Sequence, residues 1–303
     1  MDSAYSQLTL ARSRVKHVDE LRQRHSDQVI RRRVRSGAWT RMSRSVYLVA
    51  SDHPTWFDRV VAAALATGLD DVVVCGPTAA ELLGMEGADL AGPIHLCSAA
   101  PNARRAVGRG VVMHQLKTYD ADVVVIAGIR VGSPMRTVKE CARTLSPHKA
   151  VVVIESAIRG RLVTLDEVTV AFAGLRHDRG VVQARQALDR VDLRSESGLE
   201  TECRLILADA RIPPTSLQTV VVEHGTAYRL DLAYDELNVG IEVDGREGRS
   251  REARLVGDRR RQNAIVRRRA WVILRFTAYD IRRDPAYVVR TVREALAAAA
   301  AAA

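Results

Sequence analysis

Residues 229–245 read RLDLAYDELNVGIEVDG, and this stretch decides the fold of the C-terminal third of the chain. Apolar residues alternate on both sides of a short polar turn around 235–237, which predicts two antiparallel strands. Asp231 lies in the first strand and Glu242 in the second, so the hairpin brings the two carboxylates together. Asp244 shares a strand face with Glu242 because side chains alternate with a period of two.

These acids form a candidate metal site. A carboxylate in the apolar strand IEVDG is costly to bury unless a charge pairs with it, and a divalent cation would do so. Mg²⁺ or Mn²⁺ would bind hard oxygen ligands, orient a water and lower the pKa of that water. The expected metal positions are Asp231, Glu242 and Val243, with Glu200 and Asp244 as further catalytic candidates. The alternative is that these carboxylates form structural salt bridges with nearby arginines.

The elements around the hairpin predict a domain over 195–303. Ser197 can cap a helix GLETECRLILADA, the strand LQTVVVEH precedes the hairpin, and an arginine-rich helix is expected over 257–269. A strongly apolar strand, AWVILRFT, and a helix, PAYVVRTVREAL, follow. The order helix, three strands, helix, strand, helix indicates an α/β domain of the α+β kind. The alanines at 297–303 either extend the last helix or fray.

The first 50 residues predict a winged helix-turn-helix. A helical pattern covers 15–24, Ser26 can cap a second helix, Gly37 can end it, and WTRMSRSVYLVA alternates like a two-stranded wing. The second helix and the wing carry six arginines that we expect to contact DNA phosphates: Arg31, Arg32, Arg33, Arg35, Arg41 and Arg44. The alternative is an amphipathic helix that packs on a hairpin and carries its arginines incidentally.

Residues 51–190 alternate helices and strands and predict a separate α/β domain. No phosphate-binding glycine loop and no catalytic triad spacing occurs there. The scattered histidines and the four cysteines, which lack zinc spacing, indicate structural side chains of a cytoplasmic protein. The first residues, MDSAYSQLTL, do not resemble a signal peptide, and no apolar run is long enough to cross a membrane.

The charge of the chain favours a polyanionic partner. The net charge is +10, and the excess of arginine is concentrated in two stretches, 31–44 and 249–283. The planar guanidinium group suits phosphate, so clustering favours nucleic acid over a generally solvated surface. Arg259 and Arg260 of the second stretch are therefore further candidates for nucleic-acid contacts.

The motifs SGLETECRLIL, RLDLAY, VGIEVDG, DRRRQNAI and WVILRFT resemble, in order and spacing, a bacterial domain family related to the very-short-patch-repair endonucleases. That family belongs to the PD-(D/E)XK superfamily. The resemblance implies a restriction-endonuclease-like mixed sheet flanked by helices, and Mg²⁺ or Mn²⁺ held by Asp231 and Glu242. It also implies that Asp258 and Arg261 lie at the rim of the site, with the arginine near the scissile phosphate.

Two positions depart from the superfamily pattern. Asp244 stands where the superfamily has a lysine, as is usual in this particular family, and Gly248 stands where the family commonly has a histidine. These departures favour a domain that binds without turnover, whereas the retained Glu200, Asp231 and Glu242 favour an enzyme.

The motifs RRRVRSGAWTRMSRSVYLV, VVVCGPTAAELLGM and GIRVGSPMRTVKECA resemble the AbiEi-type antitoxin architecture, although Ser45 replaces the usual glycine before the wing. That resemblance implies a winged helix followed by an α/β domain, and binding to promoter DNA. Two hypotheses follow. The first is a DNA-binding, metal-dependent endonuclease acting in phage defence or a toxin–antitoxin setting. The second is an inactive regulator or antitoxin that binds DNA and a cognate toxin or another protein.

Overall fold

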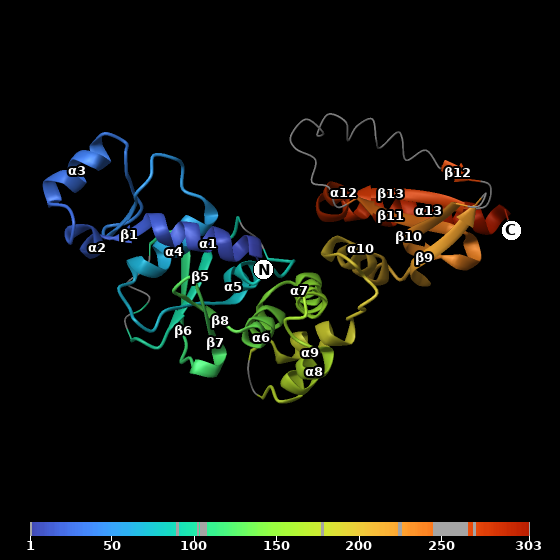
Figure 1. Ribbon diagram of the computed structural model, residues 1–303. Coiled ribbons are helices and arrows are strands. Elements are labelled where there is room, and N and C mark those ends of the chain that lie inside the picture. The colour runs from blue at the N-terminus through green and yellow to red at the C-terminus, as the bar shows by residue number, and fades with distance from the viewer. Residues whose placement is uncertain are drawn as a thin grey trace. The chain divides into compact units, whose positions relative to one another are not determined.

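The computed structural model describes residues 2–88, 91–101, 103, 108–176, 179–223, 226–244, 266–268 and 271–302. Within these ranges the chain is a mixed α/β protein with three sheets, which confirms the expected fold class. The chain divides into two compact units, Met1–Leu188 and Asp189–Ala303 (Figure 1). Each unit is described by itself below.

The first unit begins with three helices and a small three-stranded sheet. Its elements are α1 (Asp2–Arg14), β1 (Val15–His17), α2 (Val18–Arg22), α3 (Asp27–Arg35), β2 (Thr40–Arg41) and β3 (Val46–Leu48). The three strands pair antiparallel in the order β1-β3-β2. The helix predicted over 15–24 was wrong for its first three residues, because Val15, Lys16 and His17 pair with β3. Long-range strand pairing thus overrides the local helical pattern.

The predicted caps of the second helix are confirmed. The Ser26 hydroxyl accepts a hydrogen bond from the Val29 N–H at the start of α3, and Gly37 has φ +74° just after its end. Ile30 of α3 is buried with Leu21, Trp39 and Tyr47 in a core of its own. This core fixes α3 against α2 and the β2–β3 hairpin.

The rest of the first unit surrounds a five-stranded mixed sheet with the order β6-β5-β4-β8-β7. Its elements are α4 (Trp56–Ala66), β4 (Val73–Val74), α5 (Gly76–Leu82), β5 (Ile94–Ser98), β6 (Val111–Gln115), η2 (Asp120–Asp122), β7 (Val123–Ile126), β8 (Ile129–Gly132), α6 (Pro134–Thr144), α7 (Pro147–Arg159), α8 (Leu165–Ala173) and α9 (Val181–Asp189). One apolar core joins α1, β1 and β3 to α4 and this sheet. The N-terminal elements therefore pack directly on the sheet within one compact unit (Figure 1).

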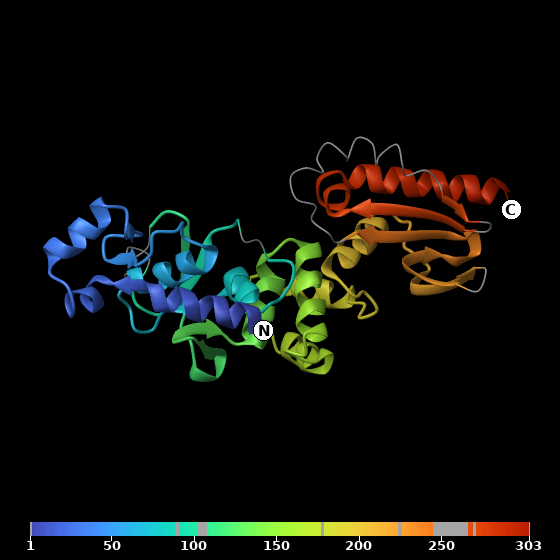
Figure 2. The same cartoon turned by 45° about the horizontal axis from the view of Figure 1, so that its top comes forward.

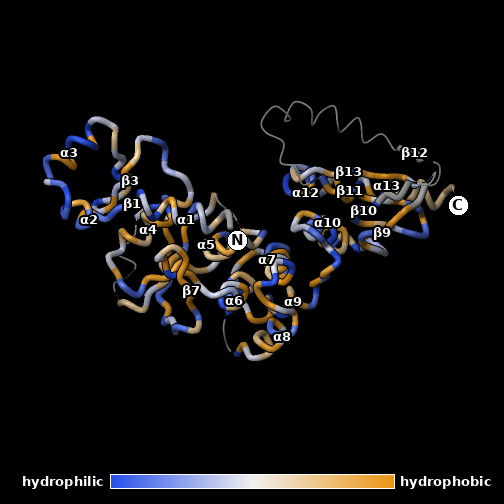
Figure 3. Tube along the Cα trace, in the orientation of Figure 1, coloured by the Kyte–Doolittle hydropathy of each residue, from blue (hydrophilic) through white to orange (hydrophobic). Residues whose placement is uncertain are grey.

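The second unit is built on the mixed sheet β12-β13-β11-β10-β9. Its elements are α10 (Gly198–Asp209), β9 (Ser216–Glu223), β10 (Thr226–Tyr234), η3 (Asp235–Leu237), β11 (Val239–Asp244), β12 (Val266–Arg268), β13 (Trp271–Thr277), α12 (Ala278–Arg283) and α13 (Pro285–Ala302). Strands β11 and β13 are parallel, and the other neighbours are antiparallel. Apolar residues of α10, α12 and α13 share one core with the central strands. Figure 2 shows α13 along this sheet, and Figure 3 shows hydrophobic residues concentrated along β10, β11 and β13.

Two expectations for this unit have a definite outcome. The arginine-rich helix predicted over 257–269 was wrong at 266–268, which form β12 and pair antiparallel with β13. The backbone of this short strand pairs with β13, and this tertiary pairing overrides the local helical pattern. The alanine tail extends α13 as far as Ala302, in keeping with the high helix propensity of alanine.

Candidate functional site

The β10–β11 hairpin places Asp231 and Glu242 opposite one another. The antiparallel register ends at Leu232↔Ile241, and Asp231 and Glu242 are the next residues beyond that pair on the two strands. The negative charge of Glu242 acts on Asp231, so the two carboxylates lie near one another. The adjacent-strand arrangement expected from the sequence is therefore present. The catalytic and metal-binding roles of these residues stay predictions.

Asp231 is a half-buried acid with an unusual proton affinity. Its Oδ2 accepts a hydrogen bond from the Val243 N–H at 2.7 Å, and in the described part of the chain no arginine or lysine forms an ion pair with it. Burial raises the pKa of Asp231 to about 6 against the effect of that hydrogen bond, and the negative charges of Glu200 and Glu242 raise it further. A cation bound near Asp231 would offset the cost of ionising this carboxyl group and lower its pKa.

Glu200 is held in place at the first turn of α10. It is 8% exposed, and the helix begins at the Ser197 cap predicted from the sequence. Three donors hold its carboxylate: the Glu196 N–H at 2.8 Å, the Ser197 hydroxyl at 2.8 Å and the Gln218 amide nitrogen Nε2 at 2.9 Å. The charge of Glu200 is thus compensated by hydrogen bonds rather than by a basic side chain among these contacts.

Glu242 and Asp244 lie toward the end of β11. The Arg275 Nε donates to Glu242 Oε2 at 2.7 Å from the neighbouring strand β13, and Asp244 is exposed. Glu242 therefore forms a salt bridge with an arginine, as the structural alternative to a metal site predicts. Sequence reasoning missed Arg275 because the parallel pairing of β11 with β13, which aligns the two residues, is not visible in local pattern.

Gln218 is a second residue that sequence reasoning missed. In the β9–β10 register Leu230 pairs with Thr219 and Leu232 pairs with Leu217. Asp231 and Gln218 occupy the position between these two pairs, where the strands are not paired. Gln218 has φ +55°, a left-handed conformation that costs a non-glycine residue about 1 kcal/mol or more. Its Oε1 is buried and has no hydrogen-bond partner among the residues that the structure describes. In an alternating strand pattern a glutamine predicts an outward, solvated side chain, so no local signal marked it.

The donor chemistry of these residues fits a hard divalent cation. Carboxylate and amide oxygens come from Asp231, Glu242, Glu200 and Gln218, and the oxygen of Gln218 accepts no hydrogen bond from a described residue. Within the described ranges, however, no group of three or more His, Cys, Asp or Glu side chains is arranged to hold a metal ion. To bind an ion, Glu242 would have to give up its hydrogen bond from Arg275. The site would therefore need the Arg275 or Glu242 side chain to move before a metal could bind.

The arginines predicted for DNA contact in the first unit are exposed. Arg31, Arg32, Arg33 and Arg35 are all exposed on α3, on the sides of the helix that do not carry buried Ile30. The four form no ion pair with another side chain in the parts of the chain that are described. Their charge is therefore available to an anionic ligand.

The wing arginines are also exposed, and one of them holds the turn. The Arg41 guanidinium donates to the carbonyl oxygens of Ser43 and Arg44, at 3.0 and 3.1 Å, between β2 and β3. Arg41 thus stiffens the tip of the hairpin beside exposed Arg44. The remaining predicted positions, Gly248, Asp258, Arg259, Arg260 and Arg261, lie outside the described residues.

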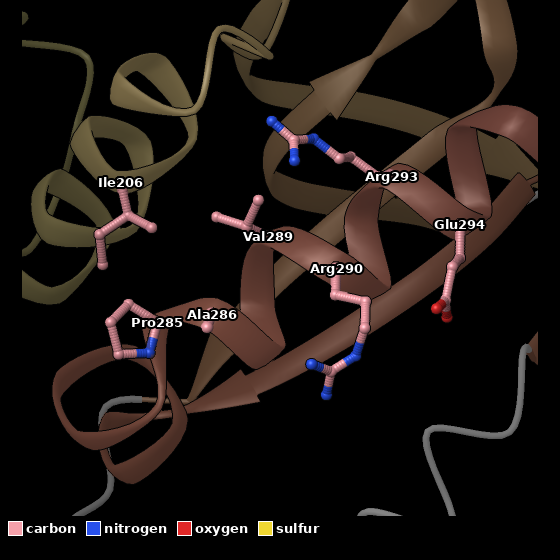
Figure 4. Close-up of a pocket in the computed structure, with 7 residues that line it drawn as sticks. All are labelled: Ile206, Pro285, Ala286, Val289, Arg290, Arg293 and Glu294. Carbon is pink, nitrogen blue, oxygen red and sulfur yellow. The ribbon is translucent and has the colours of Figure 1, made fainter.

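A cavity of about 470 Å³ lies between α10 and α13 in the second unit. Figure 4 shows Ile206 of α10 and Val289 of α13 at this cavity, with the side chains of Arg290 and Arg293 beside them. Of the described residues predicted for catalysis or metal binding, none lines it. It is therefore a feature separate from the acidic cluster.

Comparison with known proteins finds two similar chains in Mycobacterium tuberculosis. They are the uncharacterized protein MT2308 of strain CDC 1551 / Oshkosh and the uncharacterized protein Rv2248 of strain ATCC 25618 / H37Rv. Each is 29% identical over 253 residues, which cover 83% of this chain and 90% of the relative. No family model and no solved structure matches. Because the aligned length exceeds either compact unit, the similarity includes parts of both units.

No helix in the described ranges is both long enough and apolar enough to cross a lipid bilayer.

Proposed function

We propose that this protein binds DNA through its N-terminal helix-turn-helix and hydrolyses phosphodiester bonds with a divalent cation in its C-terminal unit. The observation that carries the second part is Asp231: a half-buried acid of raised pKa, opposite Glu242, to which no described basic side chain is paired. A salt bridge with Arg275 compensates the charge of Glu242, but no described basic side chain does the same for Asp231. A bound Mg²⁺ or Mn²⁺ would compensate it.

Each residue of the cluster has a definite part in this proposal. Asp231 and Glu242 would hold the ion, and Glu200 with Asp244 would support it. When bound, the ion supplies an activated water and offsets the charge that develops on the phosphate. The Val243 N–H holds one oxygen of Asp231 and thereby orients the other. Glu200 is oriented by its three donors before any substrate arrives.

The first part of the proposal rests on α3 and the β2–β3 hairpin. The helix order α2–α3 followed by a hairpin is that of a winged helix-turn-helix, whose second helix enters the major groove. Arg31, Arg32, Arg33 and Arg35 on α3 would contact phosphates or bases, and Arg44 at the hairpin would contact the backbone. DNA is therefore the proposed partner, and its capture does not depend on the acidic cluster.

The test is cleavage of plasmid DNA, single-stranded DNA and RNA by the full chain with Mg²⁺ or Mn²⁺ and with EDTA. The proposal predicts metal-dependent cleavage that Asp231→Asn abolishes while DNA binding persists. Binding without cleavage under every condition would instead support the second candidate, a regulator or antitoxin that binds DNA and a cognate protein. Two observations favour that candidate: Arg275 engages Glu242, and no described group of acidic side chains is arranged to hold a metal ion.

A further inference from the structure

We infer that Gln28 reads an adenine in the major groove of DNA, beside a guanine read by Arg32, and this inference rests on the proposed function. Both residues belong to α3, whose buried side is known. Ile30 is buried, and Val34 is partly buried against the same small core. These two residues fix which side of α3 faces the protein, and therefore which side faces a ligand.

The outer side of α3 is a stripe that begins with Gln28. An α-helix turns about 100° per residue, so Arg32 lies almost directly opposite the midline between Ile30 and Val34. Gln28, four residues earlier, lies about 40° from Arg32 around the helix, and Arg35 lies about 60° from it on the same side. All three outer side chains are exposed. The stripe is therefore the part of α3 that reaches furthest from the core.

Arg31 and Arg33 lie on the two flanks of the helix. Each is about 80° from the buried midline, on opposite sides of it, and both are exposed. A helix in the major groove has a phosphate backbone on either side and base edges in front of its outer side. We therefore expect the flanking arginines to contact phosphates, which position the protein, and the outer stripe to contact bases, which specify the sequence.

The side chains of Gln28 and Arg32 are available for such contacts. Neither side chain forms a hydrogen bond or an ion pair with another residue in the described parts of the chain. The acid next to Gln28 is compensated instead: Arg22 of α2 donates to Asp27 at 2.9 Å from Nε and at 3.3 Å from Nη2. This ion pair neutralises the negative charge at the start of α3 that would otherwise repel DNA.

The chemistry of the two side chains identifies their bases. A glutamine amide donates to N7 of adenine and accepts from its N6 amino group, and an arginine guanidinium donates to O6 and N7 of guanine. Gln28 and Arg32 are about 6 Å apart along the helix axis, close to two base steps of about 3.4 Å. The ligand we infer is duplex DNA with an adenine and a guanine within two base steps. The deep, narrow major groove of duplex RNA cannot be read in this way.

The experiment uses the full chain in EDTA, which prevents metal-dependent cleavage. A preferred site is first selected from random DNA duplexes. Fluorescence anisotropy then compares, at each position of that site, four duplexes that differ in one base pair. The variants are Gln28→Ala and Gln28→Arg, and the control is Gln23→Ala, an exposed glutamine at the end of α2. Urea denaturation shows that each variant is folded.

At one position of the site, wild type and Gln23→Ala should prefer adenine by about five- to a hundredfold. Gln28→Ala should bind all four duplexes about equally there, and Gln28→Arg should prefer guanine. The four duplexes carry the same charge, so the added positive charge of arginine cancels in their ratio. Arg32→Ala should remove a guanine preference within two base steps, whereas Arg31→Ala should weaken binding to all sequences alike.

The outcomes distinguish this inference from the proposed function. If wild type binds no duplex DNA even at low salt, the DNA-binding part of the proposed function and this inference both fail. If it binds DNA with a sequence preference that Gln28→Ala leaves unchanged, DNA binding stands and the role of Gln28 is refuted. Binding without sequence preference, or equal preference for duplex RNA, likewise refutes base reading by α3.

Discussion

The Arg275 guanidinium donates to the Glu242 carboxylate at 2.7 Å across the parallel strands β13 and β11. This contact engages one of the two acids at the centre of the candidate site. Arg275 is 63% exposed and Glu242 30% exposed at their side chains. An ion pair in that position contributes little to folding, on the order of 0–1 kcal/mol, so it competes weakly with a bound cation.

Replacing Arg275 with Met should release Glu242. We expect Mn²⁺ to bind severalfold more tightly, because Glu242 no longer exchanges a partner, and the free energy of unfolding to change by less than about 1 kcal/mol. Calorimetry with Mn²⁺ measures the first effect. Arg194→Met is the matched control, because Arg194 is also 63% exposed and its guanidinium pairs with Asp192, which is not an acid of the candidate site. Equal affinities in the two variants and wild type would refute competition by Arg275.

Asp231→Asn should change how stability depends on pH in EDTA. The folded pKa of about 6 lies above the ordinary 3.8, so between pH 4 and pH 6 the folded state holds a proton that the unfolded state has lost. The free energy of unfolding of wild type therefore falls as pH rises through this window. At pH 7 the ionised acid costs at most roughly 2–3 kcal/mol.

Asparagine removes this ionisation. The variant should exceed wild type in stability above pH 6, and the difference should shrink toward pH 4. Urea denaturation at a series of pH values, followed by the fluorescence of Trp271 in the second unit, measures it. A stability difference that is constant across pH would show that Asp231 has no raised pKa.

The arginines of α3 should account for much of the DNA affinity. Replacing Arg31, Arg32 and Arg33 with Ala removes three exposed positive charges, and the slope of log affinity against log salt should become shallower by up to about 2.7, or 0.9 for each phosphate contact. Fluorescence anisotropy with a labelled duplex at several salt concentrations measures the slope. The charge-matched control replaces three exposed arginines elsewhere: Arg161, Arg176 and Arg283. Equal losses in both variants would indicate general charge attraction.

Arg14→Met should destabilise the first unit strongly. Arg14 donates from Nε to Asp58 Oδ1 at 2.8 Å and from Nη2 to Asp58 Oδ2, and the Asp58 side chain is fully buried. Removing the arginine leaves a buried carboxylate without its cation, which costs about 3–5 kcal/mol. Urea denaturation followed by the fluorescence of Trp39 and Trp56 measures the loss.

A second substitution tests the cause of that loss. Asp58→Asn in the Arg14→Met background removes the unpaired charge, so the double variant should be more stable than Arg14→Met alone. A double variant of equal or lower stability would show that the lost packing of Arg14, and not the uncompensated charge, is responsible.

The sequence by itself determined the features that depend on neighbours along the chain. Period-two alternation and a short turn predicted that Asp231 and Glu242 occupy adjacent strands, and the register agrees. Ser26 and Ser197 were correctly identified as helix caps because a cap acts within one turn of its own helix. The exposed arginines of α3 likewise follow from a helical period around buried Ile30.

Only the tertiary structure decided which groups meet these acids. Arg275 reaches Glu242 through parallel pairing of strands separated by a long connection, and Gln218 reaches Glu200 through a left-handed backbone on an otherwise regular strand. Residues 266–268 form a strand in place of the predicted helix for the same reason. These contacts join residues far apart in sequence, and their energies come from pairing and burial that no local pattern encodes. The partner of each carboxylate is therefore decided by the folded chain.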